Sequence, residues 1–218
     1  MFRVASCLIL ALTVAACAGA RPASAPTPSS GGSAGDDKYI LQARADSTRL
    51  PYTAADIHFM SGMISHHAQA IVMAKWAPTH GASAAVIRLS ERIINAQTDE
   101  IALMQTWLRD RRQPVPQPNP KGMTMTMGGM THTMLMPGML TETQMKQLDA
   151  ARDVEFDRLF LTFMIQHHKG AVSMVQELFA SVGAGQDEVV FKFASDVNVD
   201  QSTEIVRMAE MLLSLGAP

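Results

Sequence analysis

Apolar residues recur every three to four positions along four long stretches of the chain, which is the spacing of amphipathic helices. The first stretch follows Thr53 and is expected to end near Trp76. The other three helices are expected at about residues 83–112, 141–182 and 186–215. Thr53 and Thr141 each open a capping box, a motif that starts helices. No stretch shows the alternation of a strand, so the sequence predicts an all-α fold.

The second half of the chain repeats the first. Residues 56–74 align with residues 157–175, and residues 97–104 align with residues 201–208. The matched pairs include Asp56 with Asp157, Met63 with Met164, His66 with His167, His67 with His168, and Met73 with Met174. Two helical hairpins, at about residues 53–112 and 141–215, bury their apolar faces best against each other. We therefore expect a four-helix bundle with a pseudo-two-fold axis between its halves.

Polar residues interrupt the apolar faces at matching places. With about 100° of rotation per residue, the histidine pairs straddle the core-facing stripes of the first and third helices. The second and fourth helices carry a Gln-x-x-Glu on theirs. Buried groups of this kind need a hydrogen-bond partner or a metal. A buried network that fixes the helix register is one interpretation, and recurrence in both halves favours the other, a metal site. The residues expected to act as further ligands, or to orient the histidines, are Asp56, Gln97, Glu100, Asp157, Gln201 and Glu204.

Methionines next to the histidines narrow the choice of metal. Met63 lies three and four residues before His66 and His67, and Met164 precedes the second pair in the same way. Such neighbours share a helix face. Thioether sulfur favours Cu(I), and imidazole binds copper, zinc, iron and nickel. We therefore expect copper at the histidine pairs, with Met73 and Met174 as additional ligands. Other divalent metals, or methionine as a flexible core filler, are the alternatives.

The link between the halves, residues 113–140, is rich in methionine. Its methionines, at positions 123, 125, 127, 130, 134, 136 and 139, surround His132. The intervening threonines and glycines form no amphipathic helix, so we expect a flexible segment that wraps its sulfurs around Cu(I). An apolar lid over the bundle and a plain linker are the alternatives. The candidate ligands are Met123, Met125, Met127, Met130, His132, Met134, Met136 and Met139.

The N-terminus indicates export. Residues 1–16 contain Arg3 and an apolar run too short to span a bilayer, which is typical of a signal peptide. The run ends in Val-Ala-Ala before Cys17, which resembles a bacterial lipobox, so we expect Cys17 to carry a lipid anchor. Residues 17–37 have the composition of a flexible tether, and residues 38–218 form the bundle domain. We place the protein in the cell envelope, facing the periplasm or the exterior.

The repeated motif resembles the bacterial family catalogued as domain of unknown function 305. The motif is Asp-x-x-Phe-x-x-x-Met-Ile-x-His-His-x-x-Ala-(Ile/Val)-x-Met, followed by Gln-x-x-Glu-Ile-x-x-Met. The resemblance spans roughly residues 54–215. It implies a ferritin-like helical bundle outside the cytoplasm, and some members are described as periplasmic copper-binding proteins. The second copy has Leu161 where the first has Met60, so the two sites are expected to differ.

These observations favour a binding protein that sequesters copper, as Cu(I) and also Cu(II), and so contributes to metal tolerance. A ferritin-like two-metal oxidase using Glu100 and Glu204 is the alternative from the enzyme class. A structural envelope lipoprotein is a third. The formal net charge of -2 and the lack of a basic stripe argue against nucleic acid as a partner. The sequence identifies no protein partner.

Overall fold

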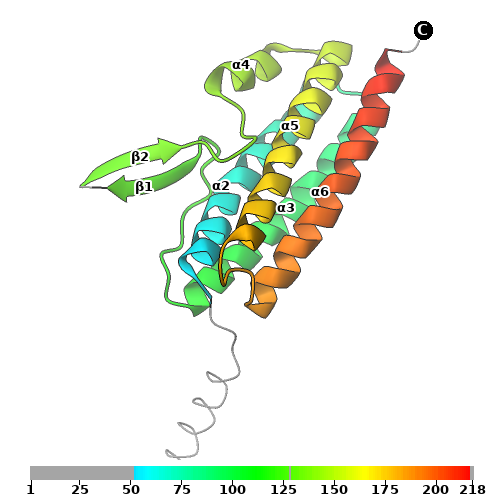
Figure 1. The fold of residues 1–218 in the computed structure, drawn as a ribbon. Coiled ribbons are helices and arrows are strands. Elements are labelled where there is room, and N and C mark those ends of the chain that lie inside the picture. Colours follow the sequence, from blue (N-terminus) through cyan, green and yellow to red (C-terminus); the bar gives the residue numbers. More distant parts are fainter. Residues whose placement is uncertain (1–51, 128, 217–218) are drawn as a thin grey trace, which may run out of the picture. The chain divides into compact units, whose positions relative to one another are not determined.

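The computed structural model describes residues 52–127 and 129–216, which belong to one compact unit. Its frame is a bundle of four long helices (Figure 1), which confirms the predicted all-α class. They are α2 (Ala54–Trp76), α3 (Ala84–Asp110), α5 (Asp153–Ala180) and α6 (Glu188–Leu215). The ends of α2, α3 and α6 lie within two residues of the predicted ones. The expected signal peptide, Cys17 and the tether lie outside the described residues.

The start of the second half differs from the prediction. The capping box at Thr141 opens a separate short helix, α4 (Glu142–Ala150), and α5 begins only at Asp153. Leu148 is the buried residue of α4, so this helix has little apolar surface to hold it in line with α5. Asp153 has a positive φ of 55° and donates its N–H to the carbonyl of His80, after the 3-10 turn η1 (Ala77–Thr79). The chain thus turns sharply before α5 enters the core.

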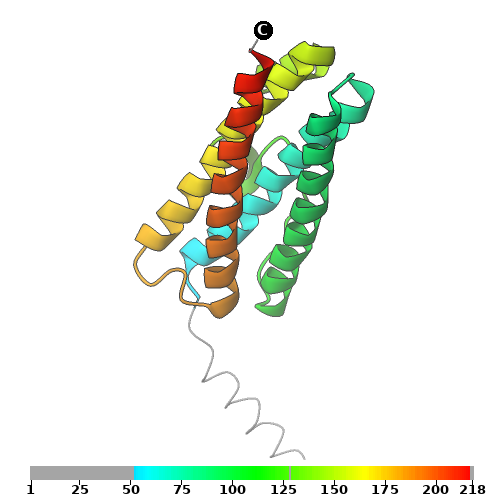
Figure 2. The ribbon, with the colours of Figure 1, turned by 90° about the vertical axis from the view of Figure 1, so that its right-hand side faces the viewer.

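The two hairpins, α2–α3 and α5–α6, pack with α2 against α5 (Figures 1 and 2). Corresponding carboxylates hold the ends of this packing. Asp56 on α2 accepts from the N–H of Gly185 at 2.7 Å, and Asp157 on α5 accepts from the N–H of Ser83 at 3.2 Å. Each acid therefore binds the loop of the opposite hairpin. The matching contacts are those of a pseudo-two-fold axis, with α2 and α5 antiparallel.

Two hydrophobic clusters fill the bundle, one toward each end. The first contains residues from the N-terminal half of α2 and the C-terminal half of α5, and the second contains residues from the opposite halves. Methionines belong to both clusters. Met60, Met63, Met104, Met136, Met139 and Met174 lie in the first, and Met73, Met164 and Met208 lie in the second. The histidine pairs sit between the two clusters, at the middle of α2 and α5.

The methionine-rich link contains a β-hairpin, a local exception to the all-α class in a segment where the sequence predicted no strand. Strands β1 (Met123–Met127) and β2 (Met130–Met134) pair antiparallel, with Met125 opposite His132. The cause is visible in the sequence, because methionine or histidine alternates with threonine on both sides of a Gly-Gly pair, which suits a two-residue hairpin turn. A two-stranded hairpin is only marginally stable alone, and contacts of β1 with α2 support it.

A short segment after the hairpin, residues 136–140, lies against α2 and α5. Its backbone approaches α5 so closely that a Cβ at Gly170 would stand 2.0 Å from the carbonyl oxygen of Pro137. Gln69 on α2 binds Leu140 twice, accepting from its N–H at 2.6 Å and donating to its carbonyl at 3.0 Å. We call residues 136–140 the strap. The strap covers the α2–α5 face at the level of the histidines.

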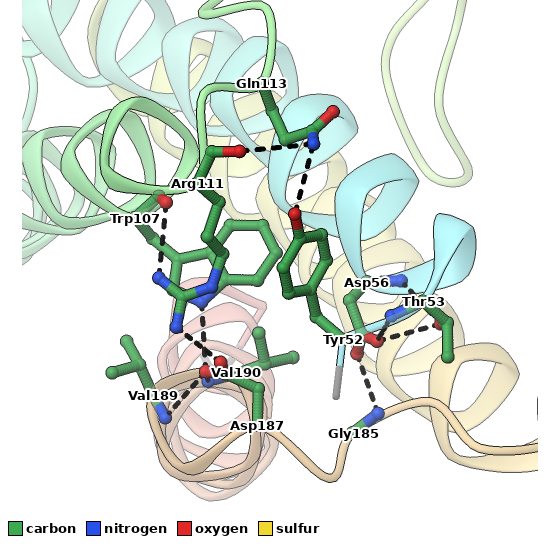
Figure 3. Close-up of polar contacts among 10 residues, drawn as sticks. All are labelled: Tyr52, Thr53, Asp56, Trp107, Arg111, Gln113, Gly185, Asp187, Val189 and Val190. Carbon is green, nitrogen blue, oxygen red and sulfur yellow. Dashed lines mark hydrogen bonds and ion pairs between the residues drawn. The ribbon is translucent and has the colours of Figure 1, made fainter. Parts of the chain in front are cut away.

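A buried ion pair fixes the bundle end where α3 meets the start of α6 (Figure 3). Asp187 caps α6 and accepts from the indole N–H of Trp107 at 3.0 Å. Its other carboxylate oxygen pairs with Arg111, whose side chain is 14% exposed. Burial alone would raise the pKa of Asp187, but the bonds from Trp107 and Arg111 outweigh it and hold the pKa below its ordinary value.

Replacing Asp187 by Ala should lower the free energy of unfolding at pH 7 by about 3 kcal/mol, because it leaves the Arg111 charge buried without its partner. Since the folded-state pKa of Asp187 is depressed, its contribution is present above about pH 4 and is lost as the pH falls further. Urea unfolding at pH 7 and pH 3 measures both effects. Asp196→Ala, which removes an exposed pair with Lys192, is the control and should change little. Equal losses in the two variants would contradict this account.

Candidate metal centre

Four buried imidazoles meet in the middle of the bundle. His66 and His67 come from α2, His167 and His168 come from α5, and all four are 0% exposed. The rings of His66 and His167 lie against each other, with centroids 3.8 Å apart and their planes tilted by 38°. We call these residues the histidine layer, since the two hydrophobic clusters lie on either side of it. The pairs predicted from the repeat are thus brought together at the pseudo-two-fold axis.

Two glutamates contact the histidine layer from the outer helices. Glu100 Oε2 on α3 lies 2.8 Å from Nε2 of His67, and Glu204 Oε2 on α6 lies 2.8 Å from Nε2 of His168. The contact between Glu204 and His168 has the geometry of a hydrogen bond. The contact between Glu100 and His67 is equally short, but its atoms are not aligned for a hydrogen bond. Burial alone would raise the pKa of the Glu204 carboxyl, but its contacts with His168 and Arg92 outweigh burial and lower it. Glu204 is therefore an ionised partner for its histidine.

Most of the buried ring nitrogens have no hydrogen-bond partner. Both ring nitrogens of His67 and His167 and Nδ1 of His66 and His168 are in this state. Nε2 of His66 lies 3.0 Å from the carbonyl oxygen of Pro137 in the strap, so it carries the proton and leaves Nδ1 as a free lone pair. Burial first, and then the charges of nearby histidines, lower the pKa of His66 and His167 well below 6.5. Neutral imidazole with a free lone pair is the form that binds metals.

Thioether groups lie on both sides of the histidine layer. Met63 and Met174 belong to the first hydrophobic cluster, and Met73 and Met164 belong to the second. All four are at most 5% exposed. Within the described residues, no three histidine, cysteine or acidic side chains converge in a geometry that could hold a metal. The buried donor atoms near this level are imidazole nitrogens and methionine sulfurs, which are ligand types that suit copper.

The remaining predicted polar residues fall into two groups. Asp56 and Asp157 lie at the helix starts, where Asp56 completes the capping box with Thr53 and both bind the opposite hairpin. Their contacts hold the fold. Gln97 and Gln201 are 3% and 4% exposed, and the side-chain oxygen of each has no partner. These glutamines lie one turn before Glu100 and Glu204, so they belong to the surroundings of the histidine layer.

A groove of about 340 Å³ lies between α3 and α6, outside the glutamates. Its lining includes Gln97, Glu100, Asp200, Gln201 and Glu204. Burial, and then the negative charge of Glu100 and neighbouring acids, raise the pKa of Asp200 above its ordinary value. The groove is thus lined by oxygen donors and carries negative charge.

The β-hairpin presents a second group of soft donors. Residues opposite each other on paired strands point to the same face, and alternate residues along a strand share it. By the register, Met123 and Met125 of β1 share a face with Met130, His132 and Met134 of β2. Met130 is 65% exposed and Met134 is 47% exposed. Met127 pairs with Met130 in the backbone register. We call this the methionine face, and its thioethers and imidazole suit Cu(I).

The structure separates Met136 and Met139 from the methionine face. Both belong to the strap, are 5% exposed and pack in the first hydrophobic cluster. Met136 reaches Gly62 on α2, where a Cβ would stand 2.5 Å from its methyl group and 3.6 Å from that of Met174. These two methionines therefore pack as core residues beside Met174.

Sequence reasoning missed the residues that seat the strap. They stand where the two copies of the repeat differ, since Gln69 aligns with Gly170 and Gly62 aligns with Phe163. Gly62 leaves room for Met136, Gly170 admits Pro137, and Gln69 binds Leu140. A bundle of two identical halves would not need these differences between the copies. Departures from the repeat are therefore the signal that could have located the strap.

Comparison with known proteins agrees with this architecture. The model of DUF305, a domain of unknown function, matches residues 56–212. A DUF305 structure from Streptomyces coelicolor is 29% identical, covers 75% of this chain and 94% of that chain, and has a TM-score of 0.62. A DUF305 fragment from Deinococcus radiodurans is 26% identical, covers 74% and 97%, and has a TM-score of 0.61. No protein of curated function matches the sequence.

A metal-bound protein is also similar. CopM in its Cu(II)-bound form is 29% identical, covers 73% of this chain and 96% of that chain, and has a TM-score of 0.57. CopM has been solved with Cu(I) and with silver as well. These ions are the soft and borderline metals that thioether and imidazole ligands select.

Proposed function

Since this chain belongs to the DUF305 family, we propose that it binds copper at the cell envelope and lowers the concentration of the free ion there. The histidine layer holds copper through imidazole, with the flanking methionines as additional donors. The methionine face captures Cu(I) at the surface. The similarity to CopM, whose structures contain Cu(I), Cu(II) and silver, supports this choice of ion.

The observation that carries the proposal is the set of six buried ring nitrogens without a hydrogen-bond partner. A buried polar group left unsatisfied costs about 1–3 kcal/mol, so a packed core would ordinarily pair such atoms. Here they are concentrated in a single layer and flanked by Met63, Met73, Met164 and Met174. A bound soft ion would take up lone pairs among these nitrogens and so stabilise the fold by mass action.

The placement in the envelope comes from the N-terminal sequence. The signal-like residues 1–16 and the lipobox-like Cys17 support export and lipid anchoring. Within residues 52–127 and 129–216, no helix is long and apolar enough to cross a membrane. An anchor at Cys17 would then hold the copper-binding domain at the membrane surface.

Replacing His66, His67, His167 and His168 by Gln should weaken Cu(II) binding at pH 7 at least about 100-fold, because each change removes an imidazole ligand. Competition with a chromophoric chelator measures the affinity, and circular dichroism monitors the fold. His80→Gln is the control, since His80 is 6% exposed but its ring nitrogens contact Thr79 and Asp149. Wild-type affinity in a folded quadruple variant would contradict the proposal.

The paired Glu–His contacts favour one alternative, a two-metal oxidase. Each glutamate lies 2.8 Å from a histidine, and the two pairs correspond in the repeat. Oxygen consumption after addition of Fe(II) distinguishes the functions. A binding protein should show none, whereas rapid uptake that disappears in Glu100→Gln/Glu204→Gln would support the oxidase.

A further inference from the structure

The histidine layer is sealed on its α2–α5 face. The strap lies directly on this face, with Pro137 against Gly170 and its carbonyl oxygen bound by His66. Gln69 fastens the strap through Leu140, and Gln166 on α5 donates to the carbonyl of Gly138 at 3.3 Å. With every ring of the layer 0% exposed, an ion approaching from this side would have to displace the strap.

The opposite side of the layer is open as far as the glutamates. The backbones of α3 and α6 approach each other less closely than those of α2 and α5 (Figure 2), and the groove lies between them. The side chains of Glu100 and Glu204 are 23% and 22% exposed, and each touches a buried histidine. These carboxylates therefore connect the solvent side of the groove with the histidine layer.

Two buried amides line the same groove. Gln97 and Gln201 are 3% and 4% exposed, and both side-chain oxygens lack a partner. An unpaired acceptor at a groove is a ready ligand for a cation or for the water that hydrates it. This observation is independent of the charge of the acids. Amide and carboxylate oxygens together form a donor set for hard or borderline cations rather than for Cu(I).

The charges in the groove break the pseudo-two-fold symmetry. Arg92 on α3 pairs with Glu204 across the groove at 3.2 Å, but the corresponding residue on α6 is Asp196. Likewise, Ala96 on α3 corresponds to Asp200 on α6. Glu100 therefore lies near the acid Asp200, whose pKa its charge helps to raise, while Glu204 is paired with an arginine. The attraction for a cation is strongest beside Glu100.

We infer that the groove between α3 and α6 is where a hydrated divalent cation first binds, through the oxygens of Glu100, Asp200, Gln97 and Gln201. From there the ion exchanges carboxylate for imidazole at His67, which Glu100 already contacts. This inference rests on the proposed copper-binding function and adds the route to it. It also separates the two oxidation states, since Cu(II) enters through oxygen donors and Cu(I) binds the methionine face.

The test measures how fast the full chain takes up Cu(II) delivered as a glycine complex, by stopped-flow at low salt and pH 7. Asp200→Asn should slow uptake about threefold to tenfold, because it removes attraction at the entrance. Arg92→Gln should speed uptake, because it removes the opposing charge. Gln97→Leu/Gln201→Leu, which keeps side-chain size and removes the oxygens, should slow it without a change of charge. Glu177→Gln, on exposed α5 surface, is the control for loss of one carboxylate and should match wild type.

The amount of copper bound at saturation, measured in the same samples, reports on the proposed function. Unchanged uptake rates in the Asp200, Arg92 and double glutamine variants, with copper still bound, would overturn the groove as the entry site alone. A wild-type chain that binds no Cu(II) would overturn the proposed function and the route together. Opposite rate changes in Asp200→Asn and Arg92→Gln support the route.

Discussion

Replacing the methionines of the methionine face by leucine is expected to weaken Cu(I) binding at pH 5.5 at least about tenfold, since soft donors determine affinity for this ion. The changes are Met123→Leu, Met125→Leu, Met130→Leu and Met134→Leu. Leucine keeps the volume and apolar character of methionine, so the variant loses sulfur and little else. The pH matters because protonation competes with metal at histidine but not at thioether. Competition with a Cu(I)-specific chelator under anaerobic conditions measures the loss.

A matched variant distinguishes ligation from packing. Met136→Leu/Met139→Leu changes the two strap methionines, which are buried in the first hydrophobic cluster and lie apart from the methionine face. We expect this double variant to retain the Cu(I) bound at pH 5.5. Helical circular dichroism verifies the fold of both variants at that pH. Full Cu(I) affinity in the methionine-face variant would show that these sulfurs are not ligands and would restore the lid or linker interpretation.

The metal-free protein should lose stability steeply as the pH falls below about 6.5. The pKa of His66 and His167 is far below this value in the fold, chiefly because of burial, whereas the unfolded chain has ordinary histidines. The unfolded state therefore binds more protons as the pH falls, and the free energy of unfolding decreases. The slope is at most about 1.4 kcal/mol per pH unit for each histidine. Urea unfolding between pH 7.5 and 5 measures it.

The double variant His66→Gln/His167→Gln should flatten this dependence, because glutamine does not titrate and can still donate to the carbonyl of Pro137. His132→Gln, in the exposed hairpin strand β2, is the control and should keep the wild-type slope. An unchanged slope in the double variant would place the acid sensitivity elsewhere in the bundle. With copper bound, the decline should begin at lower pH, since the metal competes with protons for the same nitrogens.

The bundle could be predicted from the sequence because its information is local and repeated. The helix periodicity, the capping box at Thr53 and the offset between the histidine pairs fixed the helices and their pairing. The same periodicity put Gln97 and Glu100 on the core-facing side of their helix, and the structure brings Glu100 to His67. Helical periodicity gives the side of a helix on which a residue lies. It does not give the distance to a partner on another helix or the burial of the side chain, and these decide whether a histidine is neutral and able to bind a metal.

The strap and the hairpin could not be predicted in the same way. The hairpin signal was present as alternation around Gly-Gly, but methionine alternating with threonine has no buried face, so the segment looked unstructured. The strap depends on Gly62, Gly170 and Gln69, and its seat exists only once α2 and α5 are packed. The groove depends on side chains from α3 and α6 that are about 100 residues apart in the chain. A local sequence pattern does not show which of these distant side chains come together in the fold.

The exchange of Arg92 for Asp196 and of Ala96 for Asp200 has a consequence for how such a bundle can be built. Two identical hairpins associating as a homodimer would place the same residue at both related positions, so both sides of the groove would carry equal charge. They would also let the strap lie across the α2–α5 face in two equivalent directions. When both halves belong to one polypeptide, the two related positions can carry different residues. Covalent linkage of the two halves therefore allows the two sides of the groove to carry different charge.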